Sequence, residues 1–130
     1  MEADDRAALI RSAVELFNAG DLDRAAELFH PMVEWPDLMD DKLIWGRAAV
    51  REYWERQVAV AIPEVTITEI VHVADDCVVT SVQRVLDRDT RAELLKRTDI
   101  VQRFGFRDGL ISRMAMFSSI DEARAWRPPD

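Results

Sequence analysis

The feature that most constrains this chain is a change in the spacing of its apolar residues near Pro63. Before Pro63, apolar residues recur at intervals of three and four, as they do along one side of an amphipathic helix. After Pro63 they alternate with polar residues, which is typical of a half-buried strand. The sequence therefore predicts helices first and a meander of antiparallel strands afterwards, which is the α+β class.

Turn residues divide the two halves into elements. Gly20 can close a first helix in the left-handed conformation, and Asp21 can cap the next one. Asp108-Gly109 is typical of a tight reversal between strands. The expected helices cover residues 4–17, 22–29 and 47–58, with a short strand at 32–35, longer strands at 65–72, 77–87, 93–104 and 110–118, and a final helical turn at 121–126.

Composition limits the partners of the protein. The chain has 130 residues, of which 48% are hydrophobic, and this suits a single domain over residues 1–130 with a substantial core. Its net charge of −8 argues against nucleic acid and anionic membrane surfaces as partners. The apolar runs are short and no signal peptide is visible, so we expect a cytoplasmic protein. Cys77 is the single cysteine and is expected in the core.

The order of motifs in the first half resembles a known superfamily. A turn at 18–23 leads through Ala26-Glu27-Leu28-Phe29 to Val33-Glu34-Trp35-Pro36, and a helix then follows Gly46. This order is similar to the nuclear-transport-factor-2-like superfamily, with its SnoaL-like and ketosteroid-isomerase-like domains. The resemblance implies a cone-shaped, cystatin-like roll, in which a curved antiparallel sheet carries three N-terminal helices on its concave face.

The same resemblance suggests where catalytic residues would lie. In ketosteroid-isomerase-like members, the segment similar to Thr98-Asp99-Ile100 directs an acidic residue into the cone. Carried over to the last strand, the pocket wall would include Arg113, Ala115 and Phe117. We therefore expect Asp99 and Arg113 to face one cavity as a catalytic pair, and a structural salt bridge is the alternative.

Aromatic side chains supply candidates for ligand binding. Trp35 is expected to form a flat wall for an apolar ligand, with Tyr53 and Trp54 beside it, although aromatic residues at helical spacing are also ordinary core residues. Tyr53 is the candidate hydrogen-bond donor, because a buried phenol normally has a partner.

Steroid isomerisation is not expected. In ketosteroid isomerases a tyrosine occupies the position similar to Val14, and an aspartate occupies that of Trp35. Without these two groups the enolisation chemistry lacks its hydroxyl donor and its base. No metal or cofactor is expected either, because His30 and His72 lie in no ligand motif and the acidic loop 37–41 lacks the spacing of a calcium site. We interpret that loop as a pocket flap.

Two functions follow. The first is a small-molecule enzyme of the SnoaL-like type that needs no cofactor, such as an isomerase, cyclase or hydrolase, acting by acid–base chemistry on a largely apolar ligand. The second is a non-catalytic ligand-binding or dimerisation domain. Both include a homodimer formed through the sheet, because six apolar residues are expected on the face opposite Asp99. These are Val79, Val85, Ile100, Phe104, Met114 and Met116.

Overall fold

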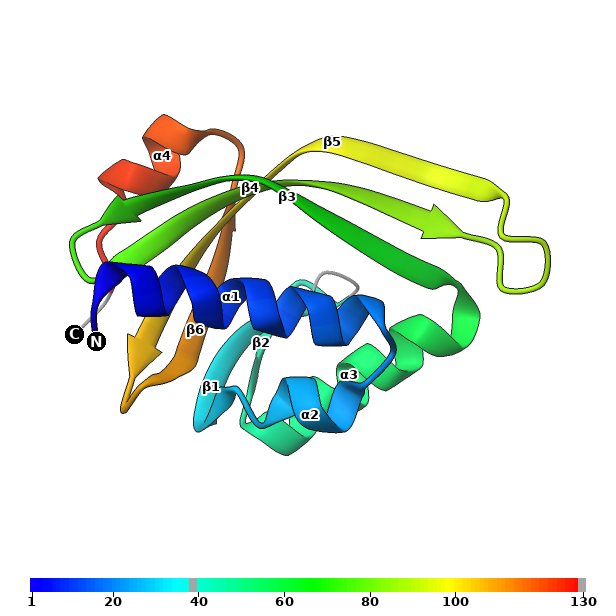
Figure 1. The fold of residues 1–130 in the computed structure, drawn as a ribbon, viewed down its shortest axis with the longest axis horizontal. Coiled ribbons are helices and arrows are strands. Elements are labelled where there is room, and N and C mark those ends of the chain that lie inside the picture. The colour runs from blue at the N-terminus through cyan, green and yellow to red at the C-terminus, as the bar shows by residue number, and fades with distance from the viewer. Residues whose placement is uncertain (38–39, 129–130) are drawn as a thin grey trace.

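The fold is a six-stranded sheet with helices on both faces (Figure 1). The structure is a computed structural model that describes residues 1–37 and 40–128. Its helices are α1 (Ala3–Asn18), α2 (Leu22–Ala26), α3 (Arg47–Val60) and α4 (Ile120–Ala125). Its strands are β1 (Phe29–Asp37), β2 (Lys42–Trp45), β3 (Ile62–Val73), β4 (Asp76–Leu86), β5 (Glu93–Arg107) and β6 (Leu110–Phe117).

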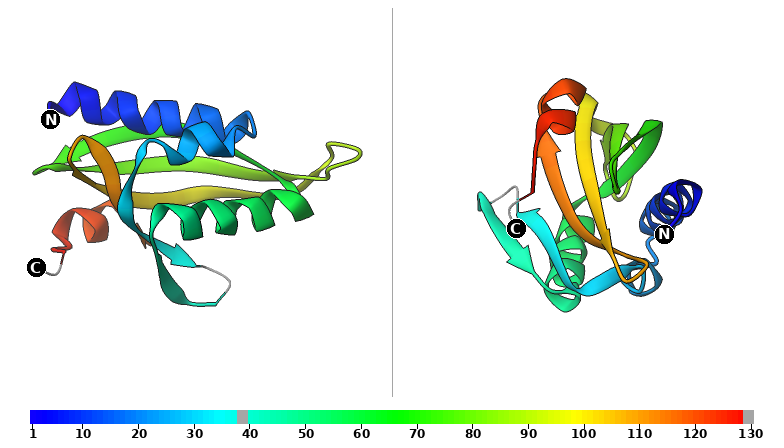
Figure 2. Two further views of the ribbon diagram at one scale, coloured as in Figure 1. Left: turned by 90° about the horizontal axis from the view of Figure 1, so that it is seen from below. Right: turned by 90° about the vertical axis from the view of Figure 1, so that its left-hand side faces the viewer.

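The sheet has the order β2-β1-β6-β5-β4-β3. All neighbouring strands are antiparallel except β1 and β6, which are parallel. The helices α1, α2 and α3 lie on one side of the sheet, whereas the short α4 lies on the other (Figures 1 and 2). The predicted α+β class, with a curved sheet and three helices on one face, is therefore confirmed.

The predicted turn between the first two helices is confirmed in detail. Gly20 has a φ of 78°, in the left-handed region that favours glycine. The backbone N–H of Asp21 donates to the carbonyl of Leu16 at 2.9 Å, which closes the end of α1. The side chain of Asp21 accepts from the N–H of Arg24 at 3.2 Å and so caps α2.

The first edge of the sheet differs from the prediction. The second helix ends at Ala26, and β1 begins at Phe29, earlier than the short strand expected at 32–35. The strand β2 was not predicted; it pairs antiparallel with residues 34–37 of β1. Two residues of the predicted flap, 38 and 39, lie outside the described residues.

The main core lies between the sheet and the three N-terminal helices. Its largest fully buried members include Ile10 on α1, Val33 on β1, Val50 on α3 and Ile111 on β6. A smaller cluster on the opposite face joins α4 to the sheet through Val78, Val101 and Ala123. Within the part of the chain that the structure describes, none of the helices has the length and apolar composition needed to span a bilayer.

One side chain links the end of α1 to β3. Asn18 Nδ2 donates to the carbonyl of Val65 at 2.8 Å, and Asn18 Oδ1 accepts from the N–H of Val65 at 2.9 Å. The amide thus makes the two hydrogen bonds that a neighbouring strand would make to this residue. It fixes the distance between the end of α1 and the sheet.

We expect the substitution Asn18→Ala to lower the free energy of unfolding by about 1 kcal/mol, because two hydrogen bonds to one backbone residue are lost at an exposed site. Urea denaturation measures this change. Glu15→Ala is the control, since Glu15 is exposed on the same helix. Equal stability of the two variants would show that the hydrogen bonds of Asn18 do not contribute to the free energy of unfolding.

Candidate functional site

A cavity of about 130 Å³ lies between the sheet, α1 and α3. Elements that are distant in sequence line it, and their inward residues are mostly aliphatic, aromatic or amide side chains. The lining residues are Ile10, Ala13, Val14, Phe17, Phe29, Trp35, Pro36, Tyr53, Trp54, Gln57, Val65, Gln83, Gln102, Phe104, Ile111, Met114 and Met116.

Aromatic rings form one wall of the cavity. Trp54 on α3 lies at the centre of this group, with its ring centroid 5.0 Å from Phe29, 5.6 Å from Trp35 and 5.7 Å from Phe17. All three contacts are edge-to-face, which is the favourable arrangement for aromatic quadrupoles. Trp35, Tyr53 and Trp54 therefore line the cavity, and their part in ligand binding stays a prediction.

The polar groups of the lining are a phenol and amides. Tyr53 is 3% exposed, and its hydroxyl accepts a hydrogen bond from Gln57 Nε2 at 3.2 Å. Gln102 Nε2 lies 3.7 Å from the sulfur of Met114, which is a weak acceptor. Gln83 completes the set. These groups can donate hydrogen bonds to a ligand and accept them, and none of them carries a charge at neutral pH.

The predicted inward orientation of Asp99 is wrong. Asp99 is exposed, whereas Gln102 and Phe104 are the residues of β5 that line the cavity. The register between β4 and β5 passes from Ser81↔Ile100 to Gln83↔Arg97, so that β5 carries one extra residue in this interval. Pairing is regular from Ile100 to Phe104, so Asp99 lies on the outer face with Val101 and Arg103, and the error lies in the set of residues that the resemblance assigned to the cavity. The bulge changes the face of Arg97, on its far side.

The predicted inward orientation of Arg113 is also wrong. Arg113, Ala115 and Phe117 share one face of β6, as predicted, but Met114 and Met116 on the other face line the cavity. The pairing of β5 with β6 passes from Gly105↔Arg113 to Phe106↔Ile111, which leaves one extra residue on β6. Ile111 therefore faces the cavity, whereas Arg113 faces the other side of the sheet. Ala115 and Phe117 lie outside the lining as well, and Phe117 packs in the small cluster beneath α4.

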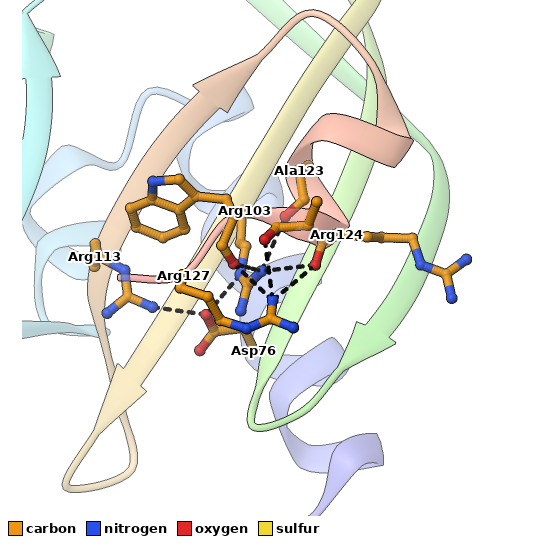
Figure 3. A network of polar contacts seen from close by, with 8 residues as sticks. Asp76, Arg103, Arg113, Ala123, Arg124 and Arg127 are labelled. Atoms are coloured by element: carbon orange, nitrogen blue, oxygen red, sulfur yellow. Dashed lines mark hydrogen bonds and ion pairs between the residues drawn. The ribbon is translucent and has the colours of Figure 1, made fainter. Parts of the chain in front are cut away.

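Arg113 forms its ion pair with Asp76 instead of Asp99 (Figure 3). One oxygen of Asp76 accepts from Arg113 Nη2 at 2.7 Å and from Arg103 Nε at 2.8 Å. Arg103 also donates to the carbonyls of Ala123, at 2.9 Å, and Trp126, at 2.7 Å. Both guanidinium groups lie over the Trp126 ring, 5.3 and 5.5 Å from its centroid. This network fastens the C-terminal segment to the sheet.

The apolar residues that supported a dimer through the sheet face inward. Val79, Ile100, Phe104 and Met114 are at most 7% exposed within the single chain, and Met116 lines the cavity. Because these side chains are already covered by the chain's own helices, they do not form the exposed apolar face that was expected. Dimerisation stays a prediction, and it no longer has this support.

A buried carboxylate that the sequence analysis did not select lies beside the cavity. Asp37 ends β1, two residues after Trp35 and on the same face of that strand, and it is 3% exposed. It accepts a hydrogen bond from the N–H of Asp40 at 3.1 Å. Sequence reasoning placed Asp37 in a polar loop, because Pro36 precedes it and further acidic residues follow.

The remaining titratable candidates do not gather at the cavity. His30 lies on β1, where Nε2 is 3.2 Å from Asp108 and Nδ1 accepts from the N–H of Met32. His72 Nδ1 is 3.5 Å from the sulfur of Cys77. Across residues 1–37 and 40–128, no three His, Cys, Asp or Glu side chains are placed to hold a metal ion.

Cys77 is fully buried, as expected for a core residue. Burial raises the pKa of the Cys77 thiol above its ordinary value of 9.0, and the guanidinium of Arg6 opposes this shift only in part. The thiol therefore stays protonated at neutral pH, and it is a poor nucleophile in the folded protein.

A family model described as "SnoaL-like domain" matches residues 10–114 of the chain. The match begins in the middle of α1 and ends within β6, and it includes all the residues that line the cavity except Met116. No curated protein matches the chain.

Several solved structures have the same fold. The epoxide hydrolase/cyclase-like enzyme SalBIII has a TM-score of 0.76 and 21% identity, covering 92% of this chain and 95% of its own. RV0760c from Mycobacterium tuberculosis, in complex with estradiol-17beta-hemisuccinate, has a TM-score of 0.75 and 18% identity over 90% and 95% of the two chains. An uncharacterized cystatin fold protein from Novosphingobium aromaticivorans has a TM-score of 0.72 and 13% identity over 85% and 95%. The predicted cystatin-like fold is confirmed.

The ion pair between Arg113 and Asp76 can be tested by a substitution at Gly105. A Cβ atom added at Gly105 would lie 2.6 Å from the guanidinium carbon of Arg113, because this side chain crosses the sheet over the glycine. We expect Gly105→Ala to displace Arg113 from Asp76 and to lower the free energy of unfolding by about 1–3 kcal/mol. Thermal and urea denaturation measure this loss.

The control is the same change in an Arg113→Ala background. If the clash causes the loss, Gly105→Ala costs much less when the guanidinium is absent. An equal cost in both backgrounds would contradict the role given to Gly105.

Proposed function

Because this chain belongs to the SnoaL-like domain family, we propose that it binds a small organic molecule in the cavity between α1, α3 and the sheet. The observation that carries the proposal is the lining itself, which combines a group of aromatic rings with three glutamine side chains and the hydroxyl of Tyr53. Hydrophobic surface with a few placed polar groups is the usual composition of a small-molecule pocket.

The expected ligand is a largely apolar compound that carries oxygen atoms. Ring faces and edges of Trp35, Trp54 and Phe29 would contact its apolar body, while Tyr53 and Gln102 would exchange hydrogen bonds with its oxygens. Two structural neighbours support this class: RV0760c has been crystallised with estradiol-17beta-hemisuccinate, and SalBIII takes part in pyran ring formation.

Binding can be tested with N-phenyl-1-naphthylamine, an uncharged probe that fluoresces in apolar surroundings. We expect saturable binding with quenching of the tryptophan emission, because Trp35 and Trp54 line the cavity. Ala13→Phe should abolish binding, since Ala13 is 7% exposed and lies in the wall of the cavity.

The matched control is Ala8→Phe, which adds the same ring to an exposed position of α1. It should bind the probe as the wild type does. Undiminished binding by a folded Ala13→Phe variant would place the probe elsewhere and contradict the proposal.

A cofactor-independent acid–base enzyme is the second candidate, and Asp37 favours it. General acid–base catalysis needs a carboxyl group within reach of the substrate, and Asp37 is the buried carboxylate on the strand face of Trp35. The ligand extracted with the protein from cells would serve as the starting point for a substrate.

For a substrate found in this way, we expect Asp37→Asn to reduce kcat by at least about 100-fold. The substitution should leave the affinity for N-phenyl-1-naphthylamine nearly unchanged. Unaltered turnover would exclude Asp37 as the acid or base and leave binding as the function.

A further inference from the structure

The bulge between Arg97 and Ile100 places Arg97 on the cavity face of the sheet, whereas Asp99 lies on the outer face. Residues that pair across antiparallel strands place their side chains on the same face of a sheet. Arg97 pairs with Gln83, which lines the cavity, and Leu95 pairs with Val85 on that same face. Arg97 is exposed, so it stands just beyond the enclosed part of the cavity, on the surface that leads into it.

The carboxylates nearest to this part of the sheet are engaged on its opposite face. Glu64, Arg84 and Lys96 pair with one another across β3, β4 and β5, one residue out of step with Gln83 and Arg97. Arg84 binds Glu64 at 3.0 Å and Glu93 at 2.8 Å, which satisfies both acids there. Among the described residues Arg97 forms no ion pair of its own.

Two other charged side chains near the β4–β5 turn form hydrogen bonds with backbone groups. Arg88 donates to the carbonyl of Val58 near the C-terminal end of α3. Asp87 accepts hydrogen bonds from the N–H groups of Asp89 and Thr90 in the β4–β5 turn, and these bonds lower the pKa of its carboxyl group. The inner face of the extended β4–β5 hairpin, visible at the right of Figure 1, thus presents the Arg97 guanidinium beside the apolar Leu95.

We infer that the ligand is an amphipathic anion, whose apolar part enters the cavity and whose carboxylate, sulfonate or similar group binds Arg97 at the entrance. This inference rests on the proposed small-molecule function. An arginine can hold such a group through two parallel hydrogen bonds. With a net charge of −8 the protein repels anions at long range, so a local cation is needed to select them.

A matched pair of probes tests the inference. N-phenyl-1-naphthylamine and 8-anilinonaphthalene-1-sulfonate share an aryl-aminonaphthalene frame, and only the second carries a sulfonate. We expect Arg97→Gln to weaken binding of the sulfonate about fivefold, the size of a partly exposed ion pair, and to leave the neutral probe unchanged. Added salt should weaken binding of the sulfonate probe by the wild type, but not by the Arg97→Gln variant.

Lys96→Gln is the control, because it removes the same charge from the neighbouring residue on the opposite face. Three results would overturn the inference: an Arg97→Gln variant with unchanged sulfonate affinity, an equal loss for both probes, or an equal effect of Lys96→Gln. Sulfonate binding that survives Ala13→Phe would also overturn it. If neither probe binds the wild type, the proposed function itself fails, which is a different outcome.

Discussion

The register between β4 and β5 determines what this fold can do. One extra residue on β5, between Arg97 and Ile100, reverses the alternation of that strand in the middle of the sheet. On one side of the bulge, Gln102 and Phe104 face the cavity; on the other side, Arg97 does. A strand without the bulge would place either the amide or the guanidinium on the outer face. Both the uncharged lining and the charged entrance depend on this local irregularity.

The outer face of the sheet has a structural role. Arg103 is 3% exposed, and a guanidinium buried to that extent is costly unless it is paired and its N–H groups are bonded. Asp76 supplies the charge, and carbonyl groups at the end of α4 supply acceptors. Of the two residues that the sequence suggested for catalysis, Arg113 therefore belongs to a structural network, in which it binds Asp76 and covers Gly105.

The architecture could be predicted from the sequence, whereas the direction of the central side chains could not. The spacing of apolar residues and turn residues such as Gly20 and Asp21 determine local structure, so the helices and the strand meander could be identified from them. The bulges in β5 and β6 arise from pairing between strands, and the residues near Asp99 and Arg113 carry no local signal that predicts them. Asp99 and Arg113 were placed wrongly because the resemblance assigned the wrong alternating set of each strand to the cavity. The bulges account for the faces of Arg97 and Ile111, which lie beyond them. The strand β2 was missed because its four residues pair only with β1.

The chemistry of the site follows from which residue types occupy the inward positions. Enzymes and binding proteins share this scaffold, so the side chains that line the cavity determine which function it has. Among the described residues that line the cavity none is charged, and the buried carboxylate of Asp37 lies next to this lining, at the end of β1. Recognition inside the cavity then depends on shape and on hydrogen bonds from Tyr53 and the amides. Charge enters at two places on the border of the cavity, Asp37 and Arg97. Because these two groups lie on different strands at the border of one cavity, a ligand that contacts both would be oriented by them.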